Sequence, residues 1–500
     1  MIDHVHPHHD LEKSNIQHAS TYWLHTEPDI NEKMQQGLTA FFLLDDAFLS
    51  ISSRLHLIKK AQRHIDLQYY IWEDDELGHL LLSELLIAAD RGVLVRLLID
   101  DQNGTELDSS LEQLIQHPNF DIKIYNPYKF RYFRKLDYLF RAARINRRMH
   151  NKLIIADGEI AVTGGRNISR KYFDASDQFE FTDCDILFYG PAVIEANQIF
   201  LSFWNDDLSC PVQHFLKSGT VNGLEQLRKK YESESLVKTT DKQKLFQAER
   251  RLREYHLASK PIRWAKAHFI GDHPNKTRHQ AKPEELLYTK FLKMMGKPQH
   301  NLQLVSAYFV PTKSGVELLQ NIKASNVDIR IITNSYLANN VPVVHAFYQK
   351  YRKQLLTLGI KLYEFKPFIQ QKKRTWYEVA TGNVIPAENK NRSCLHAKFF
   401  DVDEKVFIGS FNFDPRSKSL NTEVGLVLES ETLQQEIQQR LSQALPRIAY
   451  ELKLNERGDI IWVDQQENGT IVTHDKEPET THFQRFMIKL TSFFPIEKLM

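Results

Sequence analysis

The sequence predicts an α/β fold made of two similar α-β-α sandwich halves that are related by a pseudo-two-fold axis, with an active site at their interface. Residues 64–101 read as a strand, an acidic turn, an amphipathic helix and a second strand, and residues 301–335 repeat this order at similar lengths. Such alternation indicates parallel strands joined by helical crossovers. A short polar motif also occurs once in each half, and packing about a two-fold axis would bring its two copies into one site.

The composition is that of an ordinary globular protein. Of the 500 residues, 42% are hydrophobic and 26% are charged, which is enough to build full cores. The net charge of +2 argues against a surface that coats nucleic acid. Three cysteines without a pairing pattern indicate free thiols in a reducing compartment. We expect neither a signal peptide nor a transmembrane helix, because no uninterrupted apolar stretch is long enough.

Changes in composition divide the chain into five expected segments. These are an N-terminal tail (1–38), a first half (39–215), a charged helical linker (216–285), a second half (286–455), and a C-terminal hairpin with an amphipathic tail (456–500). The N-terminal tail contains several histidines. We interpret it as a disordered segment rather than a metal site, because no carboxylate or cysteine cluster accompanies them.

The first copy of the polar motif lies in a predicted hairpin. His150 and Lys152 are two residues apart and therefore point to the same side of a strand, and Asp157 follows five residues after the lysine. A second apolar strand then leads to Gly164 and Asn167. A lone histidine on a buried strand is usually a satisfied core residue, so this copy by itself is a weak signal.

The second copy of the motif repeats the spacing of the first. His396, Lys398 and Asp403 are followed by another apolar strand and then by Gly409 and Asn412. Lysine is rarely buried without a partner. Two copies with matching offsets therefore indicate a catalytic site rather than a chance arrangement in two cores.

The remaining positions of the motif are predicted to be structural. Asp157 and Asp403 lie at the far ends of their strands, where a turn or an ion pair is favoured. The glycines after each second strand are expected to permit close backbone approach, and Ser410 replaces one of them in the second half. These glycines are Gly164, Gly165 and Gly409. Tyrosines at the ends of the first strands are interpreted as strand core: Tyr69, Tyr70 and Tyr308.

The duplicated His-x-Lys-x4-Asp followed by Gly-x-x-Asn closely resembles the motif of the phospholipase D superfamily. Three segments are similar, more narrowly, to bacterial cardiolipin synthases of the C type. They are LQYYIWEDDELGHLLLSELLIAADRGVLVRLLIDD (67–101), RRMHNKLIIADGEIAVTGGRNIS (147–169) and FFPIEKLM (493–500). Apart from the C-terminal signature, the similarity covers roughly residues 40–215 and 285–450.

This resemblance implies a two-step transfer through a covalent phosphohistidine. One neutral imidazole attacks phosphorus, and the other protonates the departing alcohol and later deprotonates the incoming one. We expect His150 to be the nucleophile and His396 the acid. By the same analogy, Glu423 orients His396 and Asp183 orients His150, with Asp185 as the alternative to Asp183.

Four donors remain to hold the phosphate oxygens as charge develops. They are Lys152, Lys398, Asn167 and Asn412. With two lysines supplied, we expect neither a metal nor another cofactor. Arg166 has no counterpart in the second half, where Phe411 takes its place, and we expect it to contact a lipid phosphate in one half only.

Two kinds of segment bear on the substrate. Residues 130–148 combine seven basic residues with aromatics, and residues 366–378 hold a comparable place before the second histidine. Such composition suits an anionic lipid interface, a nucleic-acid backbone or a plain solvated loop. The tail from residue 483 is predicted to form an amphipathic helix that ends before Pro495 and lies in the bilayer interface, with core packing as the alternative.

The leading interpretation is a phosphatidyltransferase that makes cardiolipin from phosphatidylglycerol and either a second phosphatidylglycerol or phosphatidylethanolamine. We expect it to associate peripherally with the bacterial inner membrane and to bind no nucleic acid. The alternatives are a phospholipase D that hydrolyses phospholipids to phosphatidic acid and a phosphodiesterase acting on nucleic acid. A membrane-binding module without catalysis is disfavoured, because both histidines and both lysines are intact.

Overall fold

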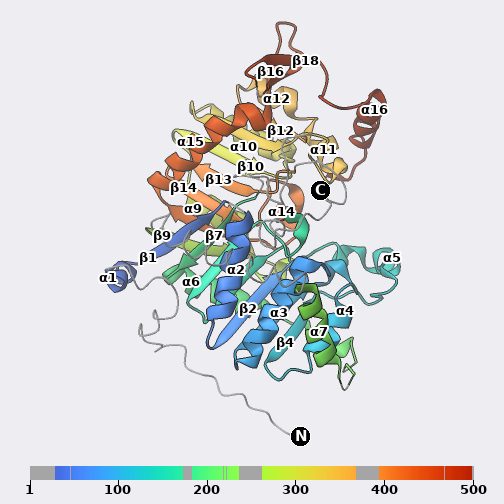
Figure 1. Cartoon of the computed structure of the whole chain (residues 1–500). Coiled ribbons are helices and arrows are strands. Elements are labelled where there is room, and N and C mark those ends of the chain that lie inside the picture. The colour runs from blue at the N-terminus through green and yellow to red at the C-terminus, as the bar shows by residue number, and fades with distance from the viewer. Residues whose placement is uncertain are drawn as a thin grey trace.

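The computed structural model describes residues 29–45, 47–172, 183–217, 219–220, 222–235, 262–367, 394–466 and 468–497. The histidine-rich N-terminus, residues 236–261 of the expected linker and residues 368–378 of the second basic stretch lie outside the described residues. Figure 1 shows the first half, coloured blue to green, below the second half, coloured yellow to red.

Strand pairing joins both halves into one continuous sheet. The first half supplies β1 (Leu38–Leu44), β2 (His64–Tyr69), β3 (Leu94–Asp100), β4 (Phe120–Tyr125), β5 (Lys152–Ala156), β6 (Ile160–Gly164), β7 (Asp185–Tyr189) and β8 (Ser209–Pro211). The second half supplies β9 (Arg263–Gly271), β10 (Asn301–Ser306), β11 (Asp328–Asn334), β12 (Lys361–Phe365), β13 (Lys398–Val402), β14 (Lys405–Gly409), β15 (Val424–Glu429) and β16 (Ala449–Leu454). A hairpin of β17 (Ile460–Gln465) and β18 (Ile471–His474) extends the second edge.

The strand order repeats about the middle of the sheet. In the first half it is β8-β4-β3-β2-β5-β6-β7-β1, with β2, β3 and β4 parallel and the rest antiparallel. In the second half β16-β12-β11-β10-β13-β14-β15-β9 follows the same pattern. Strands β1 and β9 pair with each other at the centre. This order confirms the two related halves that the sequence predicts.

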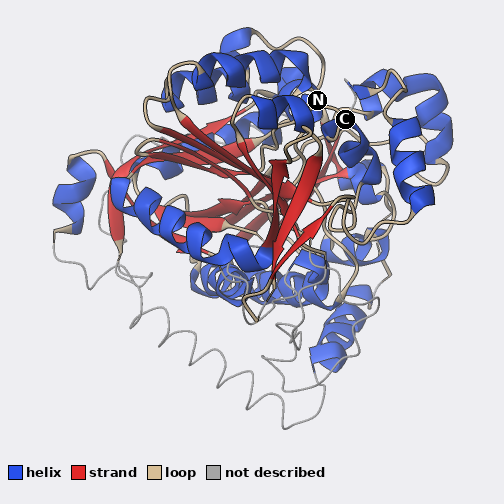
Figure 2. Ribbon diagram, turned by 90° about the horizontal axis from the view of Figure 1, so that it is seen from above, coloured by secondary structure: helices blue, strands red, loops and turns tan. Residues whose placement is uncertain are grey.

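Helices cover both faces of the sheet, as Figure 2 shows with helices in blue on either side of the red strands. Those of the first half are α1 (Ile30–Gln35), α2 (Ala47–Lys60), α3 (Glu76–Asp90), α4 (Asp108–Leu114), α5 (Arg134–Ile145), α6 (Pro191–Trp204) and α7 (Gly223–Ser235). Those that follow are α9 (Leu287–Met295), α10 (Thr312–Lys323), α11 (Pro342–Tyr348), α12 (Arg352–Thr357), α14 (Pro415–Ser419), α15 (Glu431–Ile448) and α16 (His482–Thr491). Because helices bury both faces, β5 and β6 are apolar at nearly every position rather than alternating.

One apolar core is shared between the halves. It contains side chains of β7 and α6 from the first half together with side chains of β13, β15 and α15 from the second. Within it, the rings of Phe188 and Phe269 stack with their centroids 5.6 Å apart. Separate cores lie in each half, away from this contact. The shared core fixes how the two copies of the polar motif face each other.

The expectation of a charged helical linker through residue 285 is wrong for residues 263–271. These residues form β9, which pairs with β1 on one side and β15 on the other. Ala265, Ala267 and Phe269 are buried there, whereas Lys266 and His268 are exposed. This alternation is a strand pattern, but the lysine-rich sequence just before it conceals the signal. Strand β9 is the counterpart of β1 and begins the second half.

The C-terminal segment ends in the expected helix. After β18, α16 runs to Thr491, short of Pro495. Among the residues that the structure describes, no helix is long and apolar enough to cross a membrane.

Candidate active site

The two histidines of the motif occupy equivalent places, directly before β5 and β13. Lys152 and Lys398 are the first residues of these strands, and both are fully buried. The ammonium group of each lysine donates to the backbone carbonyl of its own histidine, at 2.7 Å for Lys152 and His150. Each lysine is thereby held beside the imidazole two residues earlier, as the alternation of side chains along a strand requires.

The asparagines of the motif reach the same place from the end of β6 and of β14. The Asn167 side-chain oxygen accepts from the backbone N–H of Ile71 at 3.3 Å, and that of Asn412 accepts from Tyr308 at 3.4 Å. The two halves are alike in how the backbone fixes these oxygens. In the first half, the Asn167 side chain also hydrogen-bonds the Tyr172 hydroxyl.

Electrostatic interactions show that the two copies of the motif meet. The charges of Lys152, Lys398 and His396 all lower the pKa of His150, after burial as the largest cause. Burial and Lys398 also lower the pKa of His396, to about 4, although Asp183 opposes them. The structure therefore brings both histidines and both lysines into one buried cluster between the halves.

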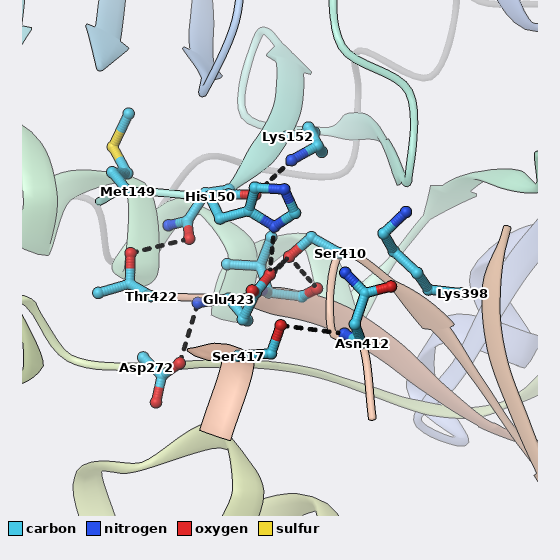
Figure 3. A network of polar contacts seen from close by, with 12 residues as sticks. Met149, His150, Lys152, Asp272, Lys398, Ser410, Asn412, Ser417, Thr422 and Glu423 are labelled. Atoms are coloured by element: carbon cyan, nitrogen blue, oxygen red, sulfur yellow. Dashed lines mark hydrogen bonds and ion pairs between the residues drawn. The ribbon is translucent and has the colours of Figure 1, made fainter. Parts of the chain in front are cut away.

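Each histidine is paired with a carboxyl group of the other half. The Nδ1 atom of His150 lies 2.8 Å from Oε2 of Glu423, and that of His396 lies 2.7 Å from Oδ2 of Asp183. Figure 3 shows the first of these pairs, with Lys152, Lys398 and Asn412 around it. The sequence-based assignment was therefore wrong in its pairing, which placed Glu423 on His396 and Asp183 on His150. It named both carboxyl groups correctly, because Asp185 contacts neither histidine.

The crossed pairing follows from strand spacing. Within one half, the histidine precedes β5 and the carboxylate precedes β7, with β6 between them. Two strand spacings amount to roughly 9.6 Å, which is too far for a direct hydrogen bond. Across the two-fold axis the distance closes, because the His150 N–H donates to the carbonyl of Thr422 and the Thr422 N–H donates to that of Arg148, each at 2.9 Å.

The environments of the two carboxyl groups differ. Burial by itself would raise the pKa of Asp183, but the charges of His396, Lys398 and Arg166 outweigh it and hold that pKa far below its ordinary value. Burial raises the pKa of Glu423 to about 7, with Lys152 only partly opposing it. Glu423 also accepts a hydrogen bond from the Ser410 hydroxyl.

Arg166 does not contact the site as expected from the sequence. It is fully buried, its guanidinium lies 3.4 Å from the Asp185 carboxylate, and it donates to the backbone carbonyl of Asp183 at 2.8 Å. Arg54 binds the same carboxylate at 3.0 Å. Arg166 therefore supports Asp183 from behind, because its guanidinium is directed to Asp185 and to the Asp183 backbone.

The glycines after β6 and β14 lie where no side chain fits. A Cβ atom on Gly165 would come within 2.3 Å of Oδ1 of Asp183, and one on Gly409 within 2.3 Å of the Val424 carbonyl. Both contacts are shorter than carbon and oxygen tolerate. In the second half Ser410 occupies the place of Gly165 and supplies its hydroxyl to Glu423.

The motif aspartates lie away from the histidines, at turns. The Asp157 carboxylate accepts from the backbone N–H groups of residues 62–64, and that of Asp403 accepts from those of residues 299–301. Each aspartate has a left-handed backbone, with φ of 55° and 53°. Each therefore ties its hairpin turn to the start of the neighbouring strand, β2 or β10.

Two tyrosine rings, both from the first half, contact the histidines. Tyr70 meets His150 edge to face with ring centroids 4.8 Å apart, and Tyr172 meets His396 at the same distance. The interpretation of Tyr70 as strand core is therefore wrong: it follows the last residue of β2 and turns toward the site. Tyr172 was missed, because its only signal in the sequence is its position five residues after Asn167. Tyr69 is core, and its hydroxyl accepts from Arg54 at 3.0 Å.

Chemically, the cluster is suited to an anionic phosphodiester. Four buried basic groups crowd together, and the pKa of each lysine is lowered mainly by burial. A bound anion would relieve their mutual repulsion and favour their charged forms. The two imidazoles, each held by a carboxyl group at Nδ1, present Nε2 for attack or proton transfer. In the described part of the chain, no group of three or more histidine, cysteine or acidic side chains is placed to hold a metal ion.

Comparison with known proteins gives a consistent result. The family described as "Cardiolipin synthase, PLD-like domain" matches residues 55–204 and 291–445. Cardiolipin synthase C of Escherichia coli is 39% identical over 476 residues, which cover 93% of this chain and 97% of that protein. Cardiolipin synthase 1 of Bacillus anthracis is 25% identical over 403 residues, which cover 78% of this chain and 64% of that protein.

A solved structure shares the fold. The crystal structure of phosphatidylserine synthase from Haemophilus influenzae aligns with a TM-score of 0.55 at 13% identity, and the alignment covers 94% of this chain and 99% of that chain. At this identity the likeness shows the two-half architecture alone.

Proposed function

This chain belongs to the cardiolipin synthase family with its phospholipase D-like domain, and from that premise we propose that it makes cardiolipin by transferring a phosphatidyl group between two phospholipids. The observation that carries the proposal is the pair of histidines, each held by a carboxyl group of the opposite half and flanked by a buried lysine. Phosphoryl transfer through a histidine needs these components: a nucleophile, a proton carrier and fixed positive charge.

The reaction takes two steps. First, Nε2 of His150 attacks the phosphorus of the donor lipid, the bond from phosphorus to the headgroup oxygen breaks, and His396 gives that oxygen a proton. Next, His396 accepts the proton of a headgroup hydroxyl of phosphatidylglycerol. That oxygen bonds to phosphorus as the bond to His150 breaks. A phosphatidylglycerol donor releases glycerol and a phosphatidylethanolamine donor releases ethanolamine, and either reaction yields cardiolipin.

Two differences favour His150 as the nucleophile. Burial and the neighbouring lysines lower its pKa well below the ordinary value, and its partner Glu423 has a pKa raised to about 7. Little therefore stabilises a protonated His150, and wherever Glu423 is ionised it accepts from Nδ1 and leaves the Nε2 lone pair available. Burial and Lys398 lower the pKa of His396 to about 4, but the ionised Asp183 opposes them and stabilises the imidazolium that forms during proton transfer. His396 is thus the better proton carrier.

The lysines and asparagines hold the phosphate. Lys152 and Asn167 approach from the first half and Lys398 and Asn412 from the second, so two donors from each side can reach the non-bridging oxygens. Negative charge grows on these oxygens during attack, and preformed donors stabilise it without reorganisation.

Product analysis tests the activity. The purified protein is incubated with mixed vesicles of phosphatidylglycerol and phosphatidylethanolamine, and the lipids are separated by mass. We expect cardiolipin with release of glycerol or ethanolamine, which also identifies the donor. Phosphatidic acid without cardiolipin would show that water resolves the intermediate, and the proposal of transfer would fail.

Trapping the intermediate tests the assignment of the histidines. A phospholipid analogue with a nitrophenol leaving group needs no acid, so His396→Ala should still form the adduct but resolve it slowly. Intact-protein mass spectrometry should show one phosphatidyl group, mapped to His150. His150→Ala is the matched control and should give none. An adduct in His150→Ala, or one on Lys152, would contradict the assignment.

A further inference from the structure

Exposed apolar side chains are concentrated in two short segments. In the described part of the chain nineteen large hydrophobic side chains are exposed, and thirteen of them lie within residues 130–140 or 483–494. The other six are scattered singly over other elements. Isolated exposed apolar residues are ordinary, but a cluster of them marks a binding surface.

The first cluster surrounds α5. Its members are Phe130, Tyr132, Phe133, Leu136, Tyr138, Leu139 and Phe140. Polar contacts hold the base of this helix: Arg131 bonds Asp108 at 2.9 Å, and the buried Asp137 accepts from the Phe130 N–H at 2.7 Å. Only Asp137 and Ile145 of α5 are buried. The helix is thus fixed in place while its apolar side chains face solvent.

The second cluster lies on α16 and the turn that follows it. Its members are Phe483, Phe486, Met487, Leu490, Phe493 and Phe494. The helix is capped at Thr481, packs through the buried Ile488, and is tied at its far end by the Tyr351 hydroxyl, which donates to Glu497 at 2.7 Å. These contacts leave the phenylalanine face outward. Core packing of this tail is therefore limited to its opposite side.

Within the two chain segments that carry the clusters, the exposed charges are positive. Lys129, Lys135 and Arg144 are exposed beside the α5 cluster, and Lys489 is exposed on α16. The one acid within residues 129–147 is the buried Asp137, and the one acid within residues 482–497 is Glu497, which is hydrogen-bonded. Exposed aromatics among cations complement the surface of an anionic bilayer.

Both clusters are connected to the catalytic residues. Helix α5 ends at Ile145, a few residues before His150. Beyond α16, Ile496 packs against the group that contains Tyr308, whose backbone N–H donates to Asn412. The helices belong to opposite halves, and Figure 1 shows both standing out on the same side of the view.

We propose that α5 and α16 together dock the protein on an anionic phospholipid surface, one helix from each half. The exposed aromatic and aliphatic side chains enter the interfacial layer, and the surrounding lysines and arginine bind lipid phosphates. Two attachment points from different halves fix the orientation of the protein on the membrane, which a single amphipathic tail would not. This inference rests on the proposed function only in that the substrates are phospholipids.

Vesicle sedimentation with matched variants tests the proposal. One variant changes Leu139 and Phe140 to Ser, a second changes Phe483 and Phe486 to Ser, and a third combines all four. The control replaces the exposed but isolated Ile87 and Ile194 by Ser. On vesicles containing phosphatidylglycerol we expect each pair to weaken binding at least tenfold and the combination at least a hundredfold. The control should bind like the unaltered protein, and raised salt should weaken binding of the unaltered protein.

A second measurement separates docking from folding and from catalysis. Turnover of a short-chain soluble phosphodiester should be unchanged in all four variants, because none alters the site. Vesicle binding that persists in the combined variant would overturn the proposal. So would loss of self-association in that variant without loss of vesicle binding, because the helices would then form a subunit contact. If even the unaltered protein fails to turn over the soluble substrate, the proposed function fails, but the binding data still decide the docking surface.

Discussion

The two halves repeat the same backbone but surround their carboxyl groups differently. Behind Asp183, the first half buries an ion-pair cluster in which Arg54 and Arg166 bind Asp185. In the second half, Gly425 takes the place of Asp185 and Phe411 takes the place of Arg166. The Ser410 hydroxyl contacts Glu423 instead. One carboxyl group is thus firmly ionised and the other has a pKa near 7. A duplicated motif therefore gives two histidines with unequal carboxyl partners, which suits the separate roles of nucleophile and proton carrier in a two-step transfer.

The largest effect is expected when the charge of Asp183 is removed, because this charge distinguishes the two carboxyl groups. Asp183→Asn should lower the rate of cardiolipin formation about 10⁴-fold, because His396 loses the charge that stabilises its imidazolium. Glu423→Gln should cost only about 10²-fold at pH 7, since Glu423 is already protonated in part of the molecules. Initial rates on mixed vesicles measure both. Equal losses in the two variants would show that the difference between the halves has no catalytic consequence.

The lysines should behave alike, in contrast to the carboxyl groups. Lys152→Met and Lys398→Met should each lower the rate about 10²- to 10³-fold, as expected for removal of one donor to a developing oxyanion. The two losses should agree within about tenfold, because both lysines are buried and start equivalent strands. Thermal melting serves as the folding control. A loss confined to one lysine would mean that the phosphate is held by one half alone.

The pH dependence of kcat/KM should follow the titration of the Glu423 carboxyl group. Below its pKa of about 7 this carboxyl group is protonated and no longer accepts from Nδ1 of His150, so the wrong tautomer is favoured. We therefore expect kcat/KM to rise as the pH increases through about 7, and this limb to disappear in Glu423→Gln. Asp183 stays ionised throughout that range. A limb that persists in Glu423→Gln would assign the titration to another group.

The turn aspartates should affect stability rather than chemistry. Asp157→Asn and Asp403→Asn should each cost about 1–3 kcal/mol in free energy of unfolding, because a carboxylate with several backbone donors is replaced. The cost should be larger for the buried Asp157 than for the partly exposed Asp403. Asparagine tolerates the left-handed backbone at both positions. Chemical denaturation measures the change, and activity at saturating substrate should remain.

The free energy of unfolding at low pH provides a second test of the role of Asp403. Burial by itself would raise its pKa, but hydrogen bonds from three backbone amides outweigh it and lower that pKa below the ordinary value. A lowered pKa adds stability that is present above the unfolded value of about 3.9 and is lost as the pH falls through the folded value. The difference between Asp403→Asn and the unaltered protein should therefore shrink below about pH 4.

The smallest expected effect is that of a chelator. Because two lysines already supply positive charge at the phosphate, EDTA should leave turnover in detergent micelles unchanged. Micelles are preferred to vesicles, since divalent ions also alter lipid surfaces. Abolition by EDTA with rescue by one metal would show that the charge at the phosphate has been assigned to the wrong groups.

The sequence predicted what depends on local pattern and repetition. The matched offsets of His150 and His396 indicated one site built from two halves, and the apolar runs of β5 and β6 indicated buried strands. It could not tell which carboxyl group meets which histidine, because that depends on two strand spacings and on the two-fold packing. The role of Arg166 was missed for a related reason: its partner Asp185 is distant in sequence and adjacent only across β6 and β7.

The crossed pairing of histidine and carboxyl group also bears on how such a protein could arise. One half on its own contains a histidine and a carboxyl group that cannot touch, so an ancestor with a single copy would have had a complete site only as a dimer. In that dimer both histidines would have had identical partners and identical proton affinities. Fusion of two copies into one chain removes this constraint. Each copy can then change independently, and the replacement of aspartate by glutamate and of Gly165 by Ser410 is the form that such divergence takes here.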